Sequence, residues 1–419
     1  MSKLQDYLDN IYPDTNHQPI KLGLDRVSSV KNFAKIEPNF PIITVGGTNG
    51  KGSVCAFLET IYSKAGYSVG CFTSPHLFKF NERIKINLEQ VDDEPILESL
   101  NIINTKKKSI ELTYFEITTL AAMDVFIKKK IDIAILEVGL GGRLDAVNIF
   151  EPDLTIITSI GMDHQDYLGD TIDEIAHEKS GICRTNKHAI LNFEHIPKSM
   201  IKELNKLNVS LSILNDDYSY KSVSESYNYS SHNFSMNNLP KPYLKGNCQL
   251  TNLAGCLRAI NLLQKELPVR LGSIKEGIRD TRLEGRLQIL SQKPYVVADV
   301  AHNIDAAINL YNFINMSKRS GKVYAVFSIL KNKDIDQVLM PFINIVDEWF
   351  VSEINDSRAQ KIDVITDTLK KYNKHVVINK FNNITQAYNN VCKKCSLNDN
   401  IIIYGSFYVV SETLNGVTP

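Results

Sequence analysis

Residues 41–53 read PIITVGGTNGKGS, and this stretch decides the fold that the sequence predicts. Residues 42–45 are all β-branched, which favours a short buried strand. The glycines that follow allow a tight turn and a close approach of the backbone to a ligand. Apolar residues at positions 54, 57, 58 and 61 then have the spacing of one helix face. Strand, glycine-rich turn, lysine and helix start together predict a phosphate cradle.

The predicted cradle combines backbone dipoles with a full charge. Free N–H groups at a helix N-terminus attract an anion, and Lys51 adds a cation. The usual pattern places a hydroxyl directly after the lysine, whereas here Gly52 intervenes before Ser53, so the loop is a variant. A glycine-rich turn without a ligand is the alternative. The expected ATP-binding residues of the loop are Thr48, Asn49, Gly50, Lys51, Gly52 and Ser53.

Length and composition indicate a two-domain globular protein. The 419 residues exceed the usual size of one hydrophobic core, and 43% hydrophobic with 22% charged residues is typical of a soluble chain. Lys plus Arg and Asp plus Glu both number 47, so no net charge favours nucleic acid or an anionic membrane. No apolar stretch approaches the ~20 residues of a membrane span, and the N-terminal residues lack the apolar core of a signal peptide.

The cysteines favour a reducing compartment. There are seven, an odd number without the spacing of a disulfide framework. Cys392 and Cys395 form a single CxxC without a second pair, which argues against a metal or redox centre. We therefore expect a cytoplasmic protein with neither nucleic acid nor a membrane as its partner.

Polar residues recur at the ends of further expected strands, which cover residues 67–73, 131–138 and 153–160. They are Ser74, Glu137 and His164. The carboxyl ends of parallel strands meet at one edge of a sheet, where ligands gather. An acid at a strand end near a phosphate loop suits Mg²⁺, a hard cation held by one or two carboxylates and phosphate oxygens. A turn-forming serine, an exposed acid and a structural histidine are the alternatives.

Two expected helices carry residues that the sequence pattern alone assigns to the core or the surface. Residues 112–126 predict a helix that opens with Tyr114 and Phe115, which are either core or pocket lining, and the pattern alone favours core. Lys179 lies near the end of a helix predicted over residues 173–184, where a surface cation is favoured by the helix dipole. Residues 192–245 predict strands or an exposed insertion, to which no chemistry is assigned.

A second alternation of strands and helices begins near residue 288. Its expected strands cover residues 295–300, 323–327, 349–354, 376–378 and 401–404. Such alternation predicts a parallel sheet. Asp299, His302 and Asn303 cluster at the end of the first of these strands and are candidates for contact with the nucleotide. We predict an α/β protein with a P-loop NTPase-like parallel-sheet domain at residues 1–287 and a smaller Rossmann-like domain at residues 288–419.

A series of short motifs runs in order through nearly the whole chain. They are GGTNGKGS (46–53), TSPHL (73–77), TYFE (113–116), GLGGRLDA (139–146), MDH (162–164), HEKSGI (177–182), EGR (284–286) and DVAHN (299–303). Together they resemble the folylpolyglutamate synthase and dihydrofolate synthase family, which belongs to the Mur ligase superfamily. Residues 192–245 match this family weakly.

The resemblance implies an ATP-dependent amide ligase that uses ATP and Mg²⁺. A substrate carboxylate takes the γ-phosphate and becomes an acyl phosphate, and the amine of L-glutamate then displaces phosphate. Lys51, the loop amides and Mg²⁺ would offset the charge of the transferring phosphoryl group. The implied acceptors are 7,8-dihydropteroate, which gives dihydrofolate, and reduced folates, which give folylpolyglutamates. We expect a monomer.

The resemblance also implies roles for single residues. Ser74, Glu137 and His164 match magnesium ligands, and Lys179 matches a lysine that is carbamylated, so that it too would serve the metal. The expected catalytic set is Lys51, Glu137, His164 and Lys179. The expected ATP contacts outside the loop, across a cleft between the domains, are Asn252, Arg286, Asp299 and His302. The segments that resemble dihydropteroate-binding elements contain Asp25, Arg26, Val27, Ser28, Thr113, Tyr114, Phe115, Glu116, Leu144, Asp145 and Ala146.

Two other interpretations remain open. One is another Mur-type ligase that acts on a cell-wall precursor, against which TYFE, GLDRV and the lack of a preceding nucleotide-sugar domain argue. The other is a non-catalytic nucleotide-binding module, which would need neither a second domain nor the strand-end residues Glu137 and His164. Glutamate-dependent release of ADP would separate the folate ligase from both.

Overall fold

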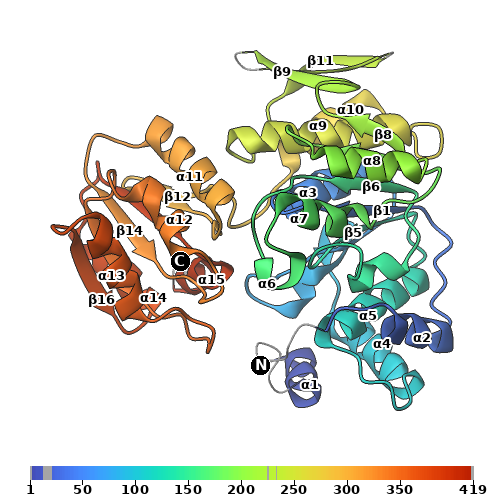
Figure 1. Ribbon diagram of the computed structural model, residues 1–419, viewed down its shortest axis with the longest axis horizontal. Coiled ribbons are helices and arrows are strands. Elements are labelled where there is room, and N and C mark those ends of the chain that lie inside the picture. Colours follow the sequence, from blue (N-terminus) through green and yellow to red (C-terminus); the bar gives the residue numbers. More distant parts are fainter. Residues whose placement is uncertain (1, 13–20, 224–225, 233, 417–419) are drawn as a thin grey trace. The chain divides into compact units, whose positions relative to one another are not determined.

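The computed structural model describes residues 2–12, 21–223, 226–232 and 234–416 (Figure 1). The chain divides into two compact units. One consists of Met1–Tyr243 and Cys248–Arg282, and the other of Leu244–Asn247 and Leu283–Pro419. The chain therefore passes between the units at the short segment Leu244–Asn247 as well as after Arg282, and the single boundary after residue 287 stays a prediction.

The main sheet of the first unit has eight strands among the described residues, in the order β4-β3-β2-β5-β1-β6-β7-β8. From β2 to β8 along this order, neighbouring strands run parallel, and β3 and β4 add an antiparallel edge. The central strands are fully buried, as expected for a parallel sheet that is covered on both faces. The strands are β1 (Ile42–Gly46), β2 (Val69–Phe72), β3 (Ile84–Ile86), β4 (Glu89–Gln90), β5 (Ile133–Glu137), β6 (Leu154–Ile157), β7 (His188–Leu191) and β8 (Ser210–Ile213).

Helices pack on both sides of this sheet. The helix α3 begins at Lys51, directly after the glycine loop, and packs against β1, β2, β5 and α10. The helix α5 packs against α2 and α4. The helices are α1 (Lys3–Ile11), α2 (Asp25–Ala34), α3 (Lys51–Lys64), α4 (Asp93–Lys106), α5 (Tyr114–Lys129), α6 (Gln165–Leu168), α7 (Ile172–Ser180), α8 (Lys198–Lys206), α9 (Asn247–Leu262) and α10 (Leu271–Asp280), with 3₁₀ turns η1 (Phe80–Arg83) and η2 (Ala146–Ile149).

A small antiparallel sheet stands apart from the main one and contains β9 (Tyr218–Val223), β10 (Ser226–Ser231) and β11 (Phe234–Pro240). Figure 1 shows it beside α9 and α10, and β11 contacts α10. The sequence predicted strands or an exposed insertion in this region, and the strands are confirmed.

The second unit is built on a six-stranded sheet, counted over the described residues, in the order β12-β13-β17-β14-β15-β16. All of its strand pairs are parallel except that of β12 with β13. Its core includes an aromatic cluster in which the rings of Phe327, Phe342 and Trp349 surround Tyr404. Its elements are β12 (Gln288–Gln292), β13 (Tyr295–Ala298), α11 (Ile304–Ser317), β14 (Val323–Phe327), α12 (Ile335–Leu339), η3 (Met340–Phe342), β15 (Glu348–Ser352), α13 (Ile362–Tyr372), β16 (Val377–Phe381), α14 (Ile384–Lys394), β17 (Asn400–Tyr404) and α15 (Phe407–Asn415).

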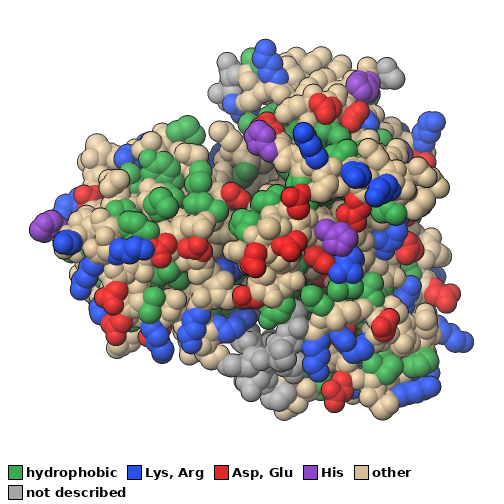
Figure 2. All heavy atoms as spheres, in the orientation of Figure 1, with side chains coloured by type: hydrophobic (Ala, Val, Ile, Leu, Met, Phe, Trp, Pro, Cys, Tyr) green, Lys and Arg blue, Asp and Glu red, His purple; other side chains and the backbone are tan. Residues whose placement is uncertain are grey.

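The predicted α/β fold class is confirmed, with a large parallel-sheet unit and a smaller α/β unit. The antiparallel edge strands β3, β4 and β12 were not predicted. Within the described part of the chain, no helix combines the length and the apolar character needed to cross a membrane. Acidic and basic side chains both occur across the face shown in Figure 2, in keeping with the zero net charge.

Candidate active site

The loop between β1 and α3 is held by the residues that follow β6. The backbone N–H of Thr48 donates to the Ser159 carbonyl at 2.9 Å, and the N–H of Asn49 donates to Ser159 Oγ at 2.8 Å. Thr158 Oγ1 donates to the Asn49 carbonyl at 2.6 Å. The Thr48 hydroxyl accepts from Gly161 N–H at 3.0 Å. The shape of the predicted phosphate loop is therefore set by the end of the neighbouring strand, and no local signal pointed to Thr158 or Ser159.

Two loop glycines permit close contacts. Gly47 has φ +140°, and a Cβ there would lie 2.0 Å from Thr158 Oγ1. Gly50 has φ +92°, and its Cβ would lie 2.6 Å from Asn252 Oδ1. Lys51 folds back over the loop, and its Nζ donates to the carbonyls of Gly47 at 3.1 Å and Thr48 at 3.2 Å. The predicted cation therefore lies at the loop that it was expected to serve.

The helix α9 supports the same loop from another direction. Asn252 packs over Gly50, and its Nδ2 donates to Gln249 Oε1 at 3.1 Å. Gln249 Nε2 in turn donates to Ser53 Oγ at 3.2 Å. The structure thus brings Asn252 to the predicted loop, and it adds Gln249, which the sequence analysis missed. Their spacing of three residues on a helix would place both on one face, which is the signal that could have found Gln249.

Glu137 and Ser74 meet at the carboxyl edge of the main sheet. Glu137 ends β5 beside Val45 of β1, and its Oε2 accepts a hydrogen bond from the Ser74 N–H at 3.1 Å. His164 has φ +53° at the start of α6, and its Nε2 lies 3.9 Å from Asp163 Oδ1. Over the described residues, no group of three or more His, Cys, Asp or Glu side chains is placed to hold a metal ion. The predicted metal set contains only two such side chains, Glu137 and His164.

Lys179 is buried in α7, with 4% of its surface exposed. Burial, followed by the positive charge of Lys51, lowers its pKa to about 7, while Asp163 and Asp145 act in the opposite direction. A lysine in bulk water has a pKa of about 10.4, so this amine is far more often neutral at pH 7 than an exposed one. Lys51, Asp145, Asp163 and Lys179 therefore form one group of interacting charges.

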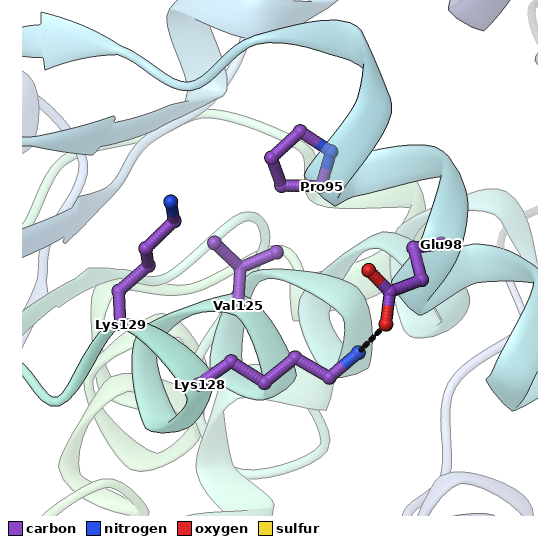
Figure 3. A pocket seen from close by; sticks show the side chains of 5 residues that line it. All are labelled: Pro95, Glu98, Val125, Lys128 and Lys129. Atoms are coloured by element: carbon purple, nitrogen blue, oxygen red, sulfur yellow. Dashed lines mark hydrogen bonds and ion pairs between the residues drawn. The ribbon is translucent and has the colours of Figure 1, made fainter.

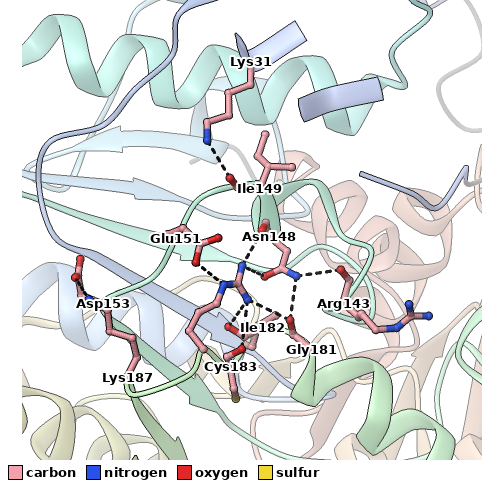
Figure 4. A network of polar contacts seen from close by, with 11 residues as sticks. Lys31, Arg143, Asn148, Ile149, Glu151, Asp153, Gly181, Ile182, Cys183 and Lys187 are labelled. Carbon is pink, nitrogen blue, oxygen red and sulfur yellow. Dashed lines mark hydrogen bonds and ion pairs between the residues drawn. The ribbon is translucent and has the colours of Figure 1, made fainter. Parts of the chain in front are cut away.

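The loop that follows Glu137 is fixed to the end of α7. A Cβ at Gly142 would lie 2.7 Å from the Glu178 carbonyl, and the Arg143 N–H donates to that carbonyl at 2.7 Å. Asn148 Nδ2 donates to the carbonyls of Arg143 at 2.9 Å and Gly181 at 3.0 Å (Figure 4). The helix end that carries Lys179 is therefore tied to the GLGGRLDA segment.

Asp145 lies in this segment and is itself buried. Its carboxylate accepts hydrogen bonds from the N–H groups of Leu140 at 2.9 Å and Val147 at 3.0 Å. Burial raises its pKa to about 6, and the backbone donors and Lys51 oppose that rise. Its neighbours Leu144 and Ala146 belong to the same turn, in which Leu144 is partly exposed and Ala146 is buried. The Asp145 carboxylate thus shapes the loop while it interacts with Lys51.

The predicted substrate segment at the start of α2 is split between surface and core. Asp25 is exposed and Ser28 is partly exposed, whereas the Val27 side chain lies in the hydrophobic core. Arg26 Nη2 is 2.9 Å from Glu116 Oε1 on α5. Glu116 also caps its own helix, because it accepts the Thr113 N–H at 2.7 Å while Thr113 Oγ1 accepts the Glu116 N–H. The structure thus brings Arg26, Thr113 and Glu116 together.

Tyr114 and Phe115 contact different surroundings. The Arg83 guanidinium lies 5.5 Å from the Tyr114 ring centroid, and Arg83 Nε donates to His76 Nδ1 at 2.8 Å. The Phe115 ring lies 5.8 Å from that of Phe72, and a Cβ at Gly139 would come within 2.6 Å of its Cζ. Both aromatic residues are half-buried, so they are neither wholly core nor wholly exposed.

Burial, helped by the charge of Arg83, lowers the pKa of His76 to about 3. His76 is therefore a neutral acceptor for Arg83 at physiological pH. The sequence analysis quoted His76 only as part of TSPHL and did not select Arg83, because the two meet through the turn η1 and no local spacing links them.

The second unit gathers its own predicted residues at the end of β13. Asp299 accepts the N–H groups of Leu287 at 2.7 Å and Ala301 at 2.8 Å. Burial raises the pKa of Asp299, and the charge of Arg286 opposes that rise. The Arg286 guanidinium and the His302 ring lie 5.0 Å and 6.3 Å from the Phe407 ring. Arg286, Asp299 and His302 are thus neighbours within this unit.

A depression between α4 and α5 has no link to the predicted chemistry (Figure 3). It is lined by Pro95, Glu98, Val125, Lys128 and Lys129. Lys128 is paired with Glu98 and Asp124 at 3.0 Å each. Because that cation is already neutralised, we assign no ligand to this surface.

Two family models match the chain. The Mur ligase middle domain matches residues 45–263, and the Mur ligase, glutamate ligase domain matches residues 285–407. The dihydrofolate synthase/folylpolyglutamate synthase of Haemophilus influenzae is 35% identical, in a match that covers 98% of this chain and 97% of that protein. The chain belongs to the dihydrofolate synthase/folylpolyglutamate synthase family of Mur ligases. The resemblance inferred from the motifs is thereby confirmed.

Solved structures of this family share the fold of the whole chain. E. coli FolC in complex with DHPP and ADP is 33% identical, with a TM-score of 0.92 over 99% of this chain and 97% of that one. A bifunctional folylpolyglutamate synthase/dihydrofolate synthase with Mn, AMPPNP and L-glutamate bound is 32% identical. Its TM-score is 0.90 over 100% of this chain and 98% of that one.

Gly47→Ala is expected to destabilise the first unit strongly. The new Cβ would meet Thr158 Oγ1, and an L-residue is strained at this φ, so the combined loss should be about 3 kcal/mol or more. Gly66→Ala is the matched control, because Gly66 has φ +94° but no atom within 4 Å of its Cβ, and the strain alone costs about 1–2 kcal/mol. Urea unfolding of both variants measures the difference, and equal losses would contradict the close contact at Gly47.

Proposed function

We propose that this chain is an ATP-dependent ligase that adds L-glutamate both to 7,8-dihydropteroate and to reduced folates. The observation that carries the proposal is its full-length match to enzymes of both activities, 35% identical over 98% of the chain for the Haemophilus influenzae protein. In the reaction the acceptor carboxylate attacks the γ-phosphate of ATP, and ADP leaves. The glutamate amine then attacks the carbonyl carbon of the acyl phosphate. The new C–N bond forms, the bond to phosphate breaks, and the amine proton passes to solvent.

The loop before α3 suits the phosphates of ATP. The N-cap residue Gly50 makes no side-chain capping bond to α3, whose N-terminus suits an anion, and Lys51 places a cation over the loop carbonyls. Solved relatives contain ADP or AMPPNP, which supports a nucleotide here. We propose that Thr48, Asn49, Gly50, Lys51, Gly52 and Ser53 bind the phosphates, with Asn252 beside them. We propose Arg286, Asp299 and His302 as further ATP contacts supplied by the second unit.

The strand-end residues suit Mg²⁺. Glu137 offers a carboxylate, Ser74 a hydroxyl and His164 an imidazole, and Mg²⁺ accepts few protein ligands when phosphate oxygens complete its shell. A relative contains Mn with AMPPNP, which supports a divalent cation in this family. When bound, the cation would neutralise charge on the transferring phosphoryl group. We propose Ser74, Glu137, His164 and a carbamate on Lys179 as the groups that hold it.

We propose that the acceptor contacts Asp25, Arg26, Ser28, Thr113, Tyr114, Phe115, Glu116, Leu144, Asp145 and Ala146, with Val27 supporting them from the core. The half-buried rings of Tyr114 and Phe115 offer flat apolar surface to a pterin or aryl group. We also propose a monomer, since the predicted residues all come from one chain, and a cytoplasmic location. The structure describes all seven cysteines and joins none of them in a disulfide, which suits a reducing compartment.

Glutamate-dependent release of ADP tests the proposed function. The wild-type protein should release ADP with dihydropteroate plus glutamate and with a reduced folate plus glutamate, and neither acceptor should suffice without glutamate. Lys51→Ala should lose at least about 100-fold in turnover, because a charge that offsets the phosphoryl group is removed. Lys106→Ala, which removes an exposed lysine of α4, is the control and should leave turnover unchanged. A wild-type protein without ADP release would contradict the proposal, and so would an active Lys51→Ala variant.

Lys179 is expected to carry a carbamate. Its neutral amine attacks CO₂ and releases one proton, so the adduct requires the deprotonated form. With the pKa lowered to about 7, that form rises from a minority to a majority between about pH 6 and pH 8. Carbon-13 NMR with labelled bicarbonate should show a carbamate signal that grows over this range.

Two variants check the origin of that signal. Lys179→Arg keeps a positive charge but cannot form the adduct, so both the signal and most activity should vanish. Lys179→Ala should regain part of its activity with added small carboxylates. Full activity of the wild-type protein with a bare ammonium at Lys179 would refute the carbamate.

Phe115→Ala is expected to reduce dihydropteroate ligation much more than folate extension. Dihydropteroate offers an aryl carboxylate, whereas a folate offers a γ-carboxylate farther from its ring, so the two rings cannot lie in one place if the reacting carboxylates coincide. We expect a loss of about 10-fold or more in kcat/KM for dihydropteroate, in line with the area that one aromatic ring buries.

Phe126→Ala is the control for this prediction. Phe126 lies on the same helix but is wholly buried in the core, so its loss should affect both reactions equally through stability. Equal losses in both reactions for Phe115→Ala would show that Phe115 is only a core residue.

A further inference from the structure

The small sheet β9–β11 sends tyrosine hydroxyls to the first turns of α9. The hydroxyl of Tyr227 donates to the Leu250 carbonyl at 3.0 Å, and the hydroxyl of Tyr220 lies 2.9 Å from Thr251 Oγ1. The two rings stack, with centroids 5.5 Å apart and an interplanar angle of 13°. The side chains therefore reach α9 as a pair, with their polar ends fixed on adjacent residues of that helix.

Asn192 adds a third link to the same turn of α9. This residue follows β7 and is fully buried. Its Nδ2 donates to the Thr251 carbonyl at 3.0 Å, and its Oδ1 accepts the hydroxyl of Tyr218 at 2.8 Å. A Cβ at Gly255 would lie 2.5 Å from its Cγ, so the amide is also pressed against the next turn of α9. Tyr218 of β9 thus acts on α9 through Asn192.

The residues held in this way lie between the two that support the glycine loop. Leu250 and Thr251 are flanked by Gln249, which bonds to Ser53, and Asn252, which covers Gly50. A rotation or shift of this turn would move both contacts at once, because backbone and side chains move together in a helix. The small sheet therefore contacts the same turn of α9 that supports the glycine loop.

We propose that the small sheet positions the nucleotide loop through α9, and that Tyr220, Tyr227 and Asn192 are positioning residues for ATP. This inference rests on the proposed function and gives a purpose to the segment that matches the family motifs weakly. The competing account is that the hydroxyls only satisfy buried polar groups and stabilise the first unit. The two accounts differ in which kinetic constant changes.

The first experiment compares Tyr220→Phe/Tyr227→Phe with Tyr229→Phe. Each substitution keeps the ring and removes one hydroxyl. The buried Tyr229 hydroxyl lies near Ser231 and Arg258 but, among the described residues, bonds to none in the Gln249–Asn252 turn of α9. The double variant loses two hydrogen bonds to α9, and we expect part of the lost free energy to weaken ATP binding. The dissociation constant of ATP should rise by about 3- to 10-fold. The KM values for glutamate and dihydropteroate should stay within about twofold of wild type, and Tyr229→Phe should leave ATP affinity unchanged.

Binding of ATP is measured by calorimetry without acceptor or glutamate. The calorimetric test needs only ATP binding. It can therefore be carried out and read even if the protein does not catalyse the ligase reaction. A double variant that loses thermal stability but keeps wild-type ATP affinity would overturn the inference, and so would Tyr229→Phe if it weakened ATP binding equally.

The second experiment asks whether the tyrosines act through Gln249. Gln249→Ala should itself weaken ATP binding, because Ser53 loses its partner. Tyr227→Phe should then weaken it by less than about twofold further in the Gln249→Ala background, since residues in one chain of contacts are not additive. Full additivity of the two substitutions would show that Tyr227 does not act through the contact of Gln249 with Ser53, and would refute this route from the small sheet to the loop.

Discussion

The contact between Gly47 and Thr158 is the constraint on which the predicted site depends. It allows the end of β1 and the end of β6, which are adjacent parallel strands, to share one loop structure. The N–H groups of Thr48 and Asn49 are satisfied by residue 159, so the loop does not need a ligand to keep its shape. Residues 161–164 continue from the same strand end. The segment with Lys51 and the segment with His164 are therefore joined by hydrogen bonds at one edge of the sheet.

Burial of Lys179 beside Lys51 is the main electrostatic cost of this edge. The pKa of Lys179 is about 7, against about 10.4 for a lysine in water. Its charged form is therefore disfavoured by roughly 5 kcal/mol relative to an exposed lysine. Asp145 and Asp163 offset that cost only in part, because Asp145 is itself buried and its pKa is raised. Carbamylation would replace the positive charge with a negative one and remove the repulsion with Lys51. It would also leave an excess of negative charge around Lys179, which a divalent cation and the cationic Lys51 would balance.

The sequence was sufficient for the fold class because strand and helix patterns are local. Residues 42–45, 131–138 and 153–160 correspond to β1, β5 and β6, and the strand-end positions of Glu137 and Ser74 followed from parallel pairing. Contacts between distant segments could not be read in this way. Asn49 meets Ser159 across 110 positions and Ser53 meets Gln249 across 196, and no periodicity encodes such a pairing. The lowered pKa of Lys179 was equally hidden, because it arises from burial and not from its neighbours in the chain.

The aromatic pair at the start of α5 shows how helix geometry limits what a motif can do. Successive residues of a helix point about 100° apart, so Tyr114 and Phe115 cannot both lie flat on one face of a ligand ring. Tyr114 has Tyr12, Phe80 and the Arg83 guanidinium around it, whereas Phe115 packs on Phe72 and the Gly139 backbone. Phe115 therefore lies against the ends of β2 and β5, close in the chain to Ser74 and Glu137, and Tyr114 lies toward α1 and η1. If both contact one acceptor, they must contact different parts of it, with Phe115 nearer the reacting carboxylate.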